Sequence, residues 1–196
     1  TRVGFYPNEA RIALDLKIIM KKSEICIATS CDSSYFPALM AFLRSLDKTN
    51  PDIPRIVFDG GLTRFQARRA ARYAEIITKE TFVKITGRGK FSYIGNTTLL
   101  KFEVASLNYE KVLYIDVDSV ILGKVNELFS FPENTVGVVR EVNMVKSMFR
   151  LKHRKILTEN VSINWDEQGF NAGIFALRPR EWSSLKIRAK ALIERF

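Results

Sequence analysis

The sequence predicts one α/β domain in which a mostly parallel sheet is flanked by helices. Short apolar strands alternate with amphipathic helices along the chain, which is the pattern of a covered parallel sheet. The run Val112–Ile115 is apolar without interruption, as expected of a strand buried on both faces. The length of 196 residues is that of a single domain with a substantial core.

The N-terminal half begins with an expected amphipathic helix over residues 8–22, in which Leu16 and Ile19 share one stripe. We treat residues 1–22 as a helical extension of the domain. Pro54 precedes the second expected strand, and Gly60-Gly61 follows it. The elements expected after the extension are a strand at 24–29, a polar turn at 30–34, a helix at 35–46, a strand at 55–58, a helix at 62–73, and strands at 75–77 and 82–85.

The C-terminal half follows a glycine-containing irregular segment at residues 87–95. Pro179 has the position of a helix start. The elements expected here are a helix at 98–107, the strand that runs into Asp116, strands at 120–122 and 136–139, a basic helix at 143–157, a strand at 173–177 and a helix at 180–196.

The composition excludes several kinds of protein. Cys26, within the first expected strand, and Cys31, just past its end, form no disulfide framework and with one His make a poor zinc set. The net charge of +10 suits nucleic acid, a membrane surface or anionic small molecules. The usual nucleic-acid motifs are absent, so no such partner is expected. No stretch has the ~20 apolar residues of a membrane span. No targeting segment is visible, so the location is left open between the Golgi or secretory lumen and the cytoplasm.

The strand Val112–Ile115 leads into Asp116-Val117-Asp118, at the strand end where open α/β sheets bind ligands. In an extended chain, residues i and i+2 point the same way, so both carboxylates can face one ion. Hard cations such as Mg²⁺ or Mn²⁺ bind such oxygens and complete their shell with phosphate. The alternative is that the pair only caps the strand and opens a turn.

Four segments together resemble glycosyltransferase family 8, the glycogenin-like enzymes of the GT-A fold. The resemblance covers residues 23–182 and implies a Rossmann-like, mixed, mostly parallel sheet. The segments are Ile27-Ala28-Thr29-Ser30-Cys31-Asp32-Ser33-Ser34-Tyr35, Leu100-Lys101-Phe102, residues 109–118 with the Asp-Val-Asp motif, and Gly169-Phe170-Asn171-Ala172-Gly173-Ile174-Phe175.

This resemblance implies retaining transfer of a sugar from a UDP-sugar, with Mn²⁺ or Mg²⁺, to an acceptor that is a glycan, a protein or a lipid. The oligomeric state is left open. The implied site residues are Ala28, Thr29, Asp32 and Tyr35 for the uridine, Lys101 for the phosphates or sugar, Val117 for the bound UDP-sugar, Asn171, Ala172 and Gly173 for the sugar pocket, and Asp116 and Asp118 for the metal.

Elementary chemistry agrees with several of these roles. The Tyr35 ring can stack on a base, and the Asp32 carboxylate can accept a hydrogen bond from the base or ribose. Small residues such as Gly173 let a donor approach the backbone. Without the resemblance, packing on the core explains Tyr35 equally well, and Lys101 is better explained as a solvated helix lysine.

The implied chemistry is electrostatic, because a divalent ion neutralises the charge that develops on the UDP leaving group. Lys101 adds to that stabilisation. Retention requires either a covalent carboxylate intermediate or same-face substitution. The nearest polar candidates for a catalytic group are Asp166, Glu167 and Gln168, which lie just before the Phe-Asn-Ala-Gly segment. They are equally well explained as loop surface.

The family pattern includes two further motifs, an Asp-Gln pair and a C-terminal segment whose His gives a third metal ligand. Neither motif is present in this sequence. Its single His, His153, does not match that motif. We therefore expect a domain truncated at its C-terminal end. The main alternative is a non-catalytic sugar-nucleotide-binding or scaffolding domain; a nucleotidyltransferase and a basic surface-binding module are further alternatives.

Overall fold

The computed structural model describes residues 24–79, 96–145, 158, 162 and 164–193. The expected helix at 8–22, the strand at 82–85 and the glycine-containing segment lie outside this part. The described elements are β1 (Ile25–Cys31), α2 (Phe36–Thr49), β2 (Arg55–Asp59), α3 (Arg64–Ala70), β3 (Glu75–Thr78), α4 (Asn96–Leu99), the 3₁₀ helix η1 (Leu100–Ser106), β4 (Lys111–Ile115), the 3₁₀ helix η2 (Asn126–Phe129), β5 (Gly137–Met144), β6 (Gln168–Leu177) and α7 (Leu185–Ile193).

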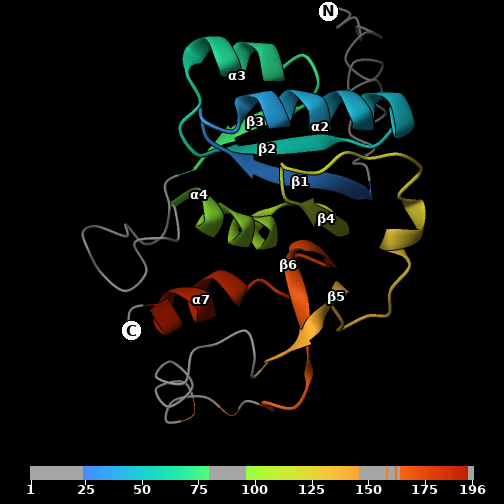
Figure 1. Ribbon diagram of the computed structural model, residues 1–196, viewed down its shortest axis with the longest axis vertical. Coiled ribbons are helices and arrows are strands. Elements are labelled where there is room, and N and C mark those ends of the chain that lie inside the picture. Colours follow the sequence, from blue (N-terminus) through green and yellow to red (C-terminus); the bar gives the residue numbers. More distant parts are fainter. Residues whose placement is uncertain (1–23, 80–95, 146–157, 159–161, 163, 194–196) are drawn as a thin grey trace, which may run out of the picture.

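The described strands form one mixed sheet in the order β3-β2-β1-β4-β6-β5 (Figure 1). β3, β2, β1 and β4 are parallel, whereas β6 is antiparallel to β4 and β5 is antiparallel to β6. The prediction of a mixed, mostly parallel sheet is therefore confirmed. From β1 the chain continues outward to β2 and later returns to β4 on the other side. Such a reversal opens a crevice at the carboxyl ends of the two central strands.

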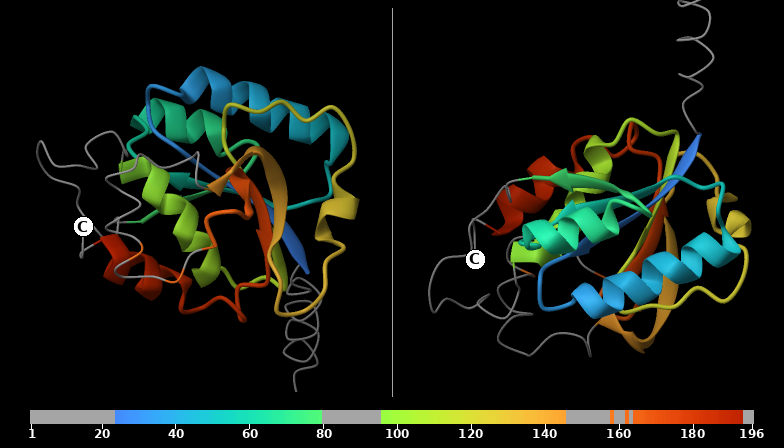
Figure 2. Two further views of the ribbon diagram at one scale, coloured as in Figure 1. Left: turned by 60° about the horizontal axis from the view of Figure 1, so that its bottom comes forward. Right: turned by 90° about the horizontal axis from the view of Figure 1, so that it is seen from above.

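Helices cover the two faces of the sheet, with α2 and α3 on one face and α4, η1 and α7 on the other (Figures 1 and 2). The side chains of β4 alternate between these layers, because successive strand residues point to opposite faces. Leu113 and Ile115 pack in the α2 layer, and Val112 and Tyr114 pack in the η1 layer. All four are buried, so the predicted strand with two buried faces is confirmed.

The strand β1 is longer than expected, because it runs to Cys31. Ser30 and Cys31 therefore belong to the strand and not to the turn that was predicted for residues 30–34. Both are buried at its carboxyl end. This extension carries them to the crevice between β1 and β4.

The expected strand at 120–122 is wrong. The backbone of this segment bonds to side chains of α2 and its C-cap instead of to a strand. The Ile121 amide donates to Ser45 Oγ (2.9 Å), the Asn50 side-chain amide donates to the Gly123 carbonyl (3.0 Å), and the Val125 amide donates to Asn50 Oδ1 (3.1 Å). Buried Asn50 thus holds the segment that follows the Asp-Val-Asp motif against α2.

Several other boundaries differ from the predictions. The predicted helix at 98–107 is α4 followed by η1, and the last helix begins at Leu185, after a turn that includes Pro179. Asn143 and Met144 belong to β5 and not to a basic helix, whose residues 146–157 lie outside the described part. β6 begins at Gln168, before the expected residue 173. None of the described helices combines the length and the apolar character needed to cross a membrane.

Candidate active site

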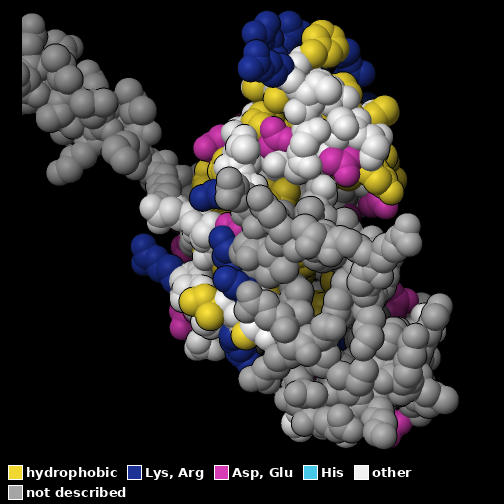
Figure 3. All heavy atoms as spheres, turned by 90° about the vertical axis from the view of Figure 1, so that its left-hand side faces the viewer, with side chains coloured by type: hydrophobic (Ala, Val, Ile, Leu, Met, Phe, Trp, Pro, Cys, Tyr) yellow, Lys and Arg dark blue, Asp and Glu magenta, His cyan; other side chains and the backbone are white. Residues whose placement is uncertain are grey.

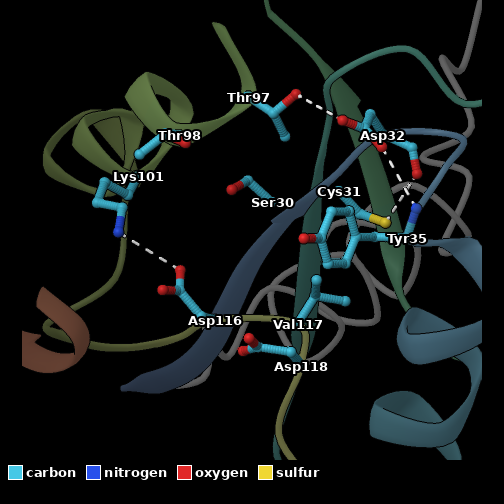
Figure 4. A pocket seen from close by; sticks show the side chains of 10 residues that line it. All are labelled: Ser30, Cys31, Asp32, Tyr35, Thr97, Thr98, Lys101, Asp116, Val117 and Asp118. Atoms are coloured by element: carbon cyan, nitrogen blue, oxygen red, sulfur yellow. Dashed lines mark hydrogen bonds and ion pairs between the residues drawn. The ribbon is translucent and has the colours of Figure 1, made fainter. Parts of the chain in front are cut away.

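A pocket of about 320 Å³ lies at the carboxyl ends of β1 and β4, where the chain reversal predicts a crevice (Figure 4). Its walls come from the loop after β1, from α4 and η1, and from the turn after β4. The lining residues are Ser30, Cys31, Asp32, Tyr35, Thr97, Thr98, Lys101, Asp116, Val117 and Asp118.

The two carboxylates of the Asp-Val-Asp motif line this pocket from a turn and not from an extended strand. β4 ends at Ile115, and Val117 and Asp118 lie in the turn. The prediction explained the shared direction of the two carboxylates by an extended chain, and this explanation is wrong. The Asp116 amide donates to the Gly173 carbonyl (2.7 Å), which fixes the start of the turn against β6. The turn places both carboxylates at the same pocket.

Lys101 reaches into the pocket from η1. Its Nζ lies 3.4 Å from Asp116 Oδ1 and donates to the Ala172 carbonyl at 3.1 Å. The side chain is only 12% exposed and lies over the Tyr114 ring. Lys101 is therefore not a solvated helix lysine, but a cation held beside the half-exposed Asp116 carboxylate.

Tyr114 of β4 contacts the pocket residue Ser30, because its hydroxyl lies 2.8 Å from Ser30 Oγ. Its ring is stacked on Phe175. Burial, and next the charge of Asp116, raise the pKa of Tyr114, so its hydroxyl stays protonated. Deprotonation would place a second anion in a buried position near Asp116. The phenol is therefore a neutral group that packs behind two lining residues, Ser30 and Lys101.

Asp32 organises the loop between β1 and α2. Its Oδ1 accepts hydrogen bonds from Ser34 Oγ (2.5 Å), the Ser34 amide (2.9 Å) and the Tyr35 amide (3.3 Å). These bonds, led by the one from the Ser34 hydroxyl, lower the pKa of Asp32. Thr97 Oγ1 donates to the other oxygen, Oδ2, at 3.4 Å. Asp32 is thus an ionised acceptor with one oxygen engaged in its own loop and the other facing α4.

Tyr35 immediately precedes α2, and its side chain is 55% exposed beside the pocket (Figure 4). The alternative explanation, an aromatic residue packed on the core, does not account for this exposure. An exposed ring at a pocket wall can stack on a flat ligand.

Gly173 lets the strand β6 approach the Asp116 carboxylate. A Cβ atom on Gly173 would lie 2.7 Å from Asp116 Oδ2 and 2.9 Å from Asn171 Oδ1. Asn171 in turn accepts a hydrogen bond from the Gly173 amide at 2.7 Å. Only a glycine leaves both side-chain oxygens where they are, so this position controls the placement of Asp116.

The variant Gly173→Ala is expected to displace the Asp116 carboxylate while the sheet stays folded. Binding of UDP with Mn²⁺, the ligands that the sequence predicts for this site, should weaken roughly tenfold, the effect typical of disturbing the groups that orient a metal ligand. Isothermal titration calorimetry measures it. The matched control is Gly137→Ala on β5, where the nearest contact of a new Cβ is an ordinary 3.6 Å. Equal affinity in the two variants would contradict this role of Gly173.

Some predicted site residues are not among those that line the pocket. Ala28 and Thr29 are fully buried in β1, two residues and one residue before the first lining residue, Ser30. Their contact with uridine stays a prediction. Asp166 is exposed in the turn before β6, and the Gln168 side chain donates to the Glu141 carbonyl at 2.8 Å. Their catalytic role also stays a prediction, without support from the pocket geometry.

The pocket contains four residues that the sequence interpretation missed, namely Ser30, Cys31, Thr97 and Thr98. The signal for Ser30 and Cys31 was present, because they directly precede Asp32 at a strand end. Thr97 and Thr98 lie one helical turn before Lys101, a spacing that brings residues to one side of a helix. Burial raises the pKa of the Cys31 thiol to about 12, so this cysteine is not an active nucleophile.

Asp116 and Asp118 suit a divalent cation as two hard oxygen ligands. Mg²⁺ is commonly bound through one or two carboxylates together with substrate phosphates and water, so the pair fits this use. Within the described ranges, no cluster of three or more His, Cys, Asp or Glu side chains could hold a metal by itself. The chemistry of the site therefore suits an ion bound jointly with a phosphorylated ligand.

The sheet, its crevice and the carboxylate pair after β4 define a GT-A type glycosyltransferase fold. The family model described as glycosyl transferase family 8 matches residues 26–193. This chain belongs to glycosyltransferase family 8, as its motifs predicted. No match was found among curated proteins.

Solved structures with the same fold include the galactosyltransferase LgtC in complex with donor and acceptor sugar analogues. It is 18% identical at a TM-score of 0.63, and the match covers 86% of this chain and 64% of LgtC. The bifunctional glycosyltransferase WbbM is 18% identical at a TM-score of 0.64, over 89% and 35% of the two chains. Core-mannan synthase A from Aspergillus fumigatus is 11% identical at a TM-score of 0.54, and the match covers 90% of this chain and 66% of the synthase. The chain thus spans less than two thirds of the length of LgtC.

Proposed function

We propose that this protein transfers a sugar from a UDP-sugar to an acceptor with retention of configuration, and that Mn²⁺ or Mg²⁺ held by Asp116 and Asp118 assists. The observation that carries the proposal is the arrangement of one pocket. The carboxylate pair and Lys101 lie in the same cavity as the exposed ring of Tyr35. A diphosphate needs cations and a base needs a flat apolar surface, so the pocket has a group for each part of a nucleotide.

The residues of the pocket divide the work between binding and charge stabilisation. Asp116 and Asp118 would hold a divalent ion, which would supply charge neutralisation for a departing diphosphate. Lys101 adds a second positive charge beside it, and its bond to the Ala172 carbonyl holds the ammonium in place. Tyr35 stacks on the base, and the Asp32 carboxylate accepts a hydrogen bond from the ribose or base. Retention of configuration rests on the family resemblance, whereas the catalytic roles of Asp166 and Gln168 rest only on their position just before the Phe-Asn-Ala-Gly segment.

A second candidate function is sugar-nucleotide binding without transfer. The observation that favours it is that Asp116 and Asp118 form a pair of carboxylates to which the described part of the chain adds no third His, Cys, Asp or Glu ligand. Such a domain would still bind UDP with metal but would lack turnover.

The deciding experiment combines binding and turnover on the full chain. Calorimetry with UDP in the presence of Mn²⁺ or of EDTA, and with GDP for comparison, tests the base and the metal. GDP is the informative competitor, because core-mannan synthase A has been solved in a Mn/GDP form. We expect metal-dependent binding of UDP in preference to GDP, together with UDP release from a UDP-sugar. Metal-dependent UDP binding without release would select the second candidate, and absence of UDP binding would contradict both.

A further inference from the structure

The helix α3 and the turn after it carry a concentrated positive charge that the pocket does not use. Arg64, Arg68, Arg69 and Arg72 are all exposed. The sequence contains no acidic residue between Asp59 and Glu75. Within the described part of the chain, none of the four arginines forms an ion pair. Among the described residues, no carboxylate therefore neutralises the charge of this surface by an ion pair.

A large aromatic side chain lies within this basic surface. Phe65 is 66% exposed, and the Arg69 guanidinium lies 5.6 Å from the centre of its ring. At 3.6 residues per turn, Arg64, Phe65, Arg68 and Arg69 spread over an arc of roughly 140° on one side of the helix. The buried Ala70 lies on the opposite side, toward the core. Figure 3 views the molecule from the left-hand side of Figure 1. Lysine and arginine side chains gather around hydrophobic ones at its top, where α3 lies.

The combination of arginines and an exposed phenyl ring suits the surface of an anionic membrane. Guanidinium groups pair with lipid phosphates, and each basic residue near such a surface contributes favourably. An aromatic ring on the same helix face can enter the boundary between headgroups and acyl chains. The surface is a convex helix face with one ring. Proteins that bind single-stranded nucleic acid use a groove with successive stacking aromatics instead.

We propose that α3 is a docking surface for an anionic phospholipid bilayer. The contact is peripheral, with the arginines at the phosphates and Phe65 at the headgroup boundary. Gln66 on the same helix donates to the Ser33 carbonyl at 3.1 Å, which ties α3 to the loop beside the pocket. Docking therefore brings the pocket near the bilayer. The binding itself does not depend on the proposed transfer activity.

The test is co-sedimentation of the full chain with phosphatidylcholine vesicles, with and without phosphatidylglycerol. We expect binding only to the anionic vesicles, and weaker binding as salt is raised. The double variant Arg64→Gln, Arg68→Gln should bind roughly 10- to 30-fold more weakly. The variant Phe65→Ser should also weaken binding without any change of charge.

The matched control is the double variant Arg44→Gln, Lys48→Gln, which removes the same charge from exposed positions on α2. It should bind anionic vesicles like the unmodified protein, and circular dichroism checks that every variant is folded. Equal losses in the two double variants would assign binding to net charge alone and overturn the proposal. So would an absence of binding to anionic vesicles, or a preference for RNA over vesicles at equal salt.

Discussion

Replacement of Asp116 by asparagine is expected to abolish metal-dependent UDP binding. Asparagine keeps the shape of the side chain but removes the negative charge that faces the pocket and pairs with Lys101 at 3.4 Å. Because loss of an outer-shell partner alone costs 10- to 100-fold in metal affinity, loss of a ligand should cost about 100-fold or more. Calorimetry with UDP and Mn²⁺ measures the effect, and EDTA should remove the difference between variant and unmodified protein.

The control for this variant is Asp52→Asn, which removes an exposed carboxylate from the loop before β2. It should bind UDP with Mn²⁺ like the unmodified protein. The proposed metal site would be wrong if Asp116→Asn retained metal-dependent UDP binding at the original affinity.

Replacement of Lys101 by methionine is expected to change two affinities in opposite directions. Without nucleotide, the ammonium competes with a metal ion for Asp116, so Mn²⁺ alone should bind more tightly to the variant. With nucleotide, the variant lacks a positive charge beside the diphosphate, so UDP should bind more weakly. Turnover of a UDP-sugar should fall by roughly 10²- to 10³-fold, the usual effect of removing one electrostatic contact to the transition state.

The matched control is Lys111→Met at the opposite end of β4, where the lysine lies over Phe131 at 5.6 Å and not at the pocket. That variant should leave both affinities unchanged. If Lys101→Met lowered the affinities for Mn²⁺ and for UDP together, Lys101 would act by supporting the fold of the pocket and not by its charge.

Much of the fold was predictable from local pattern. The parallel strands β1, β2 and β4 have apolar runs that end in turn-forming residues, and α2 has apolar residues spaced for one buried face. The segment 120–122 has a similar apolar run but is not a strand, because Ser45 binds the backbone of Ile121 and Asn50 binds the backbone of the residues that follow, Gly123 and Val125. No local pattern can distinguish a strand partner from a side chain that is remote in sequence.

The candidate site was predictable in its charged and aromatic members, but only in part. Asp116, Lys101 and Tyr35 were named from motifs, and the structure brings them to one pocket. Ser30 and Thr97 were missed, although Ser30 lies close before Asp32 at a strand end and Thr97 lies one helical turn before Lys101. Serine and threonine are common, so these sequence signals become specific only when the fold places β1 and α4 at the same pocket. Ala28 and Thr29 were named because they match the positions that hold the uridine in the family. They lie buried in β1, and their contact with uridine stays a prediction.

The sequence by itself determined that a buried strand ends in two carboxylates, and its motifs determined the family. Only the tertiary structure decided how those carboxylates are held. The turn after β4 bonds to Gly173 of β6, and Lys101 crosses from η1 to Asp116. The physical reason is that local sequence controls periodicity and turns, whereas the position of a charge depends on partners that only the packed sheet brings together.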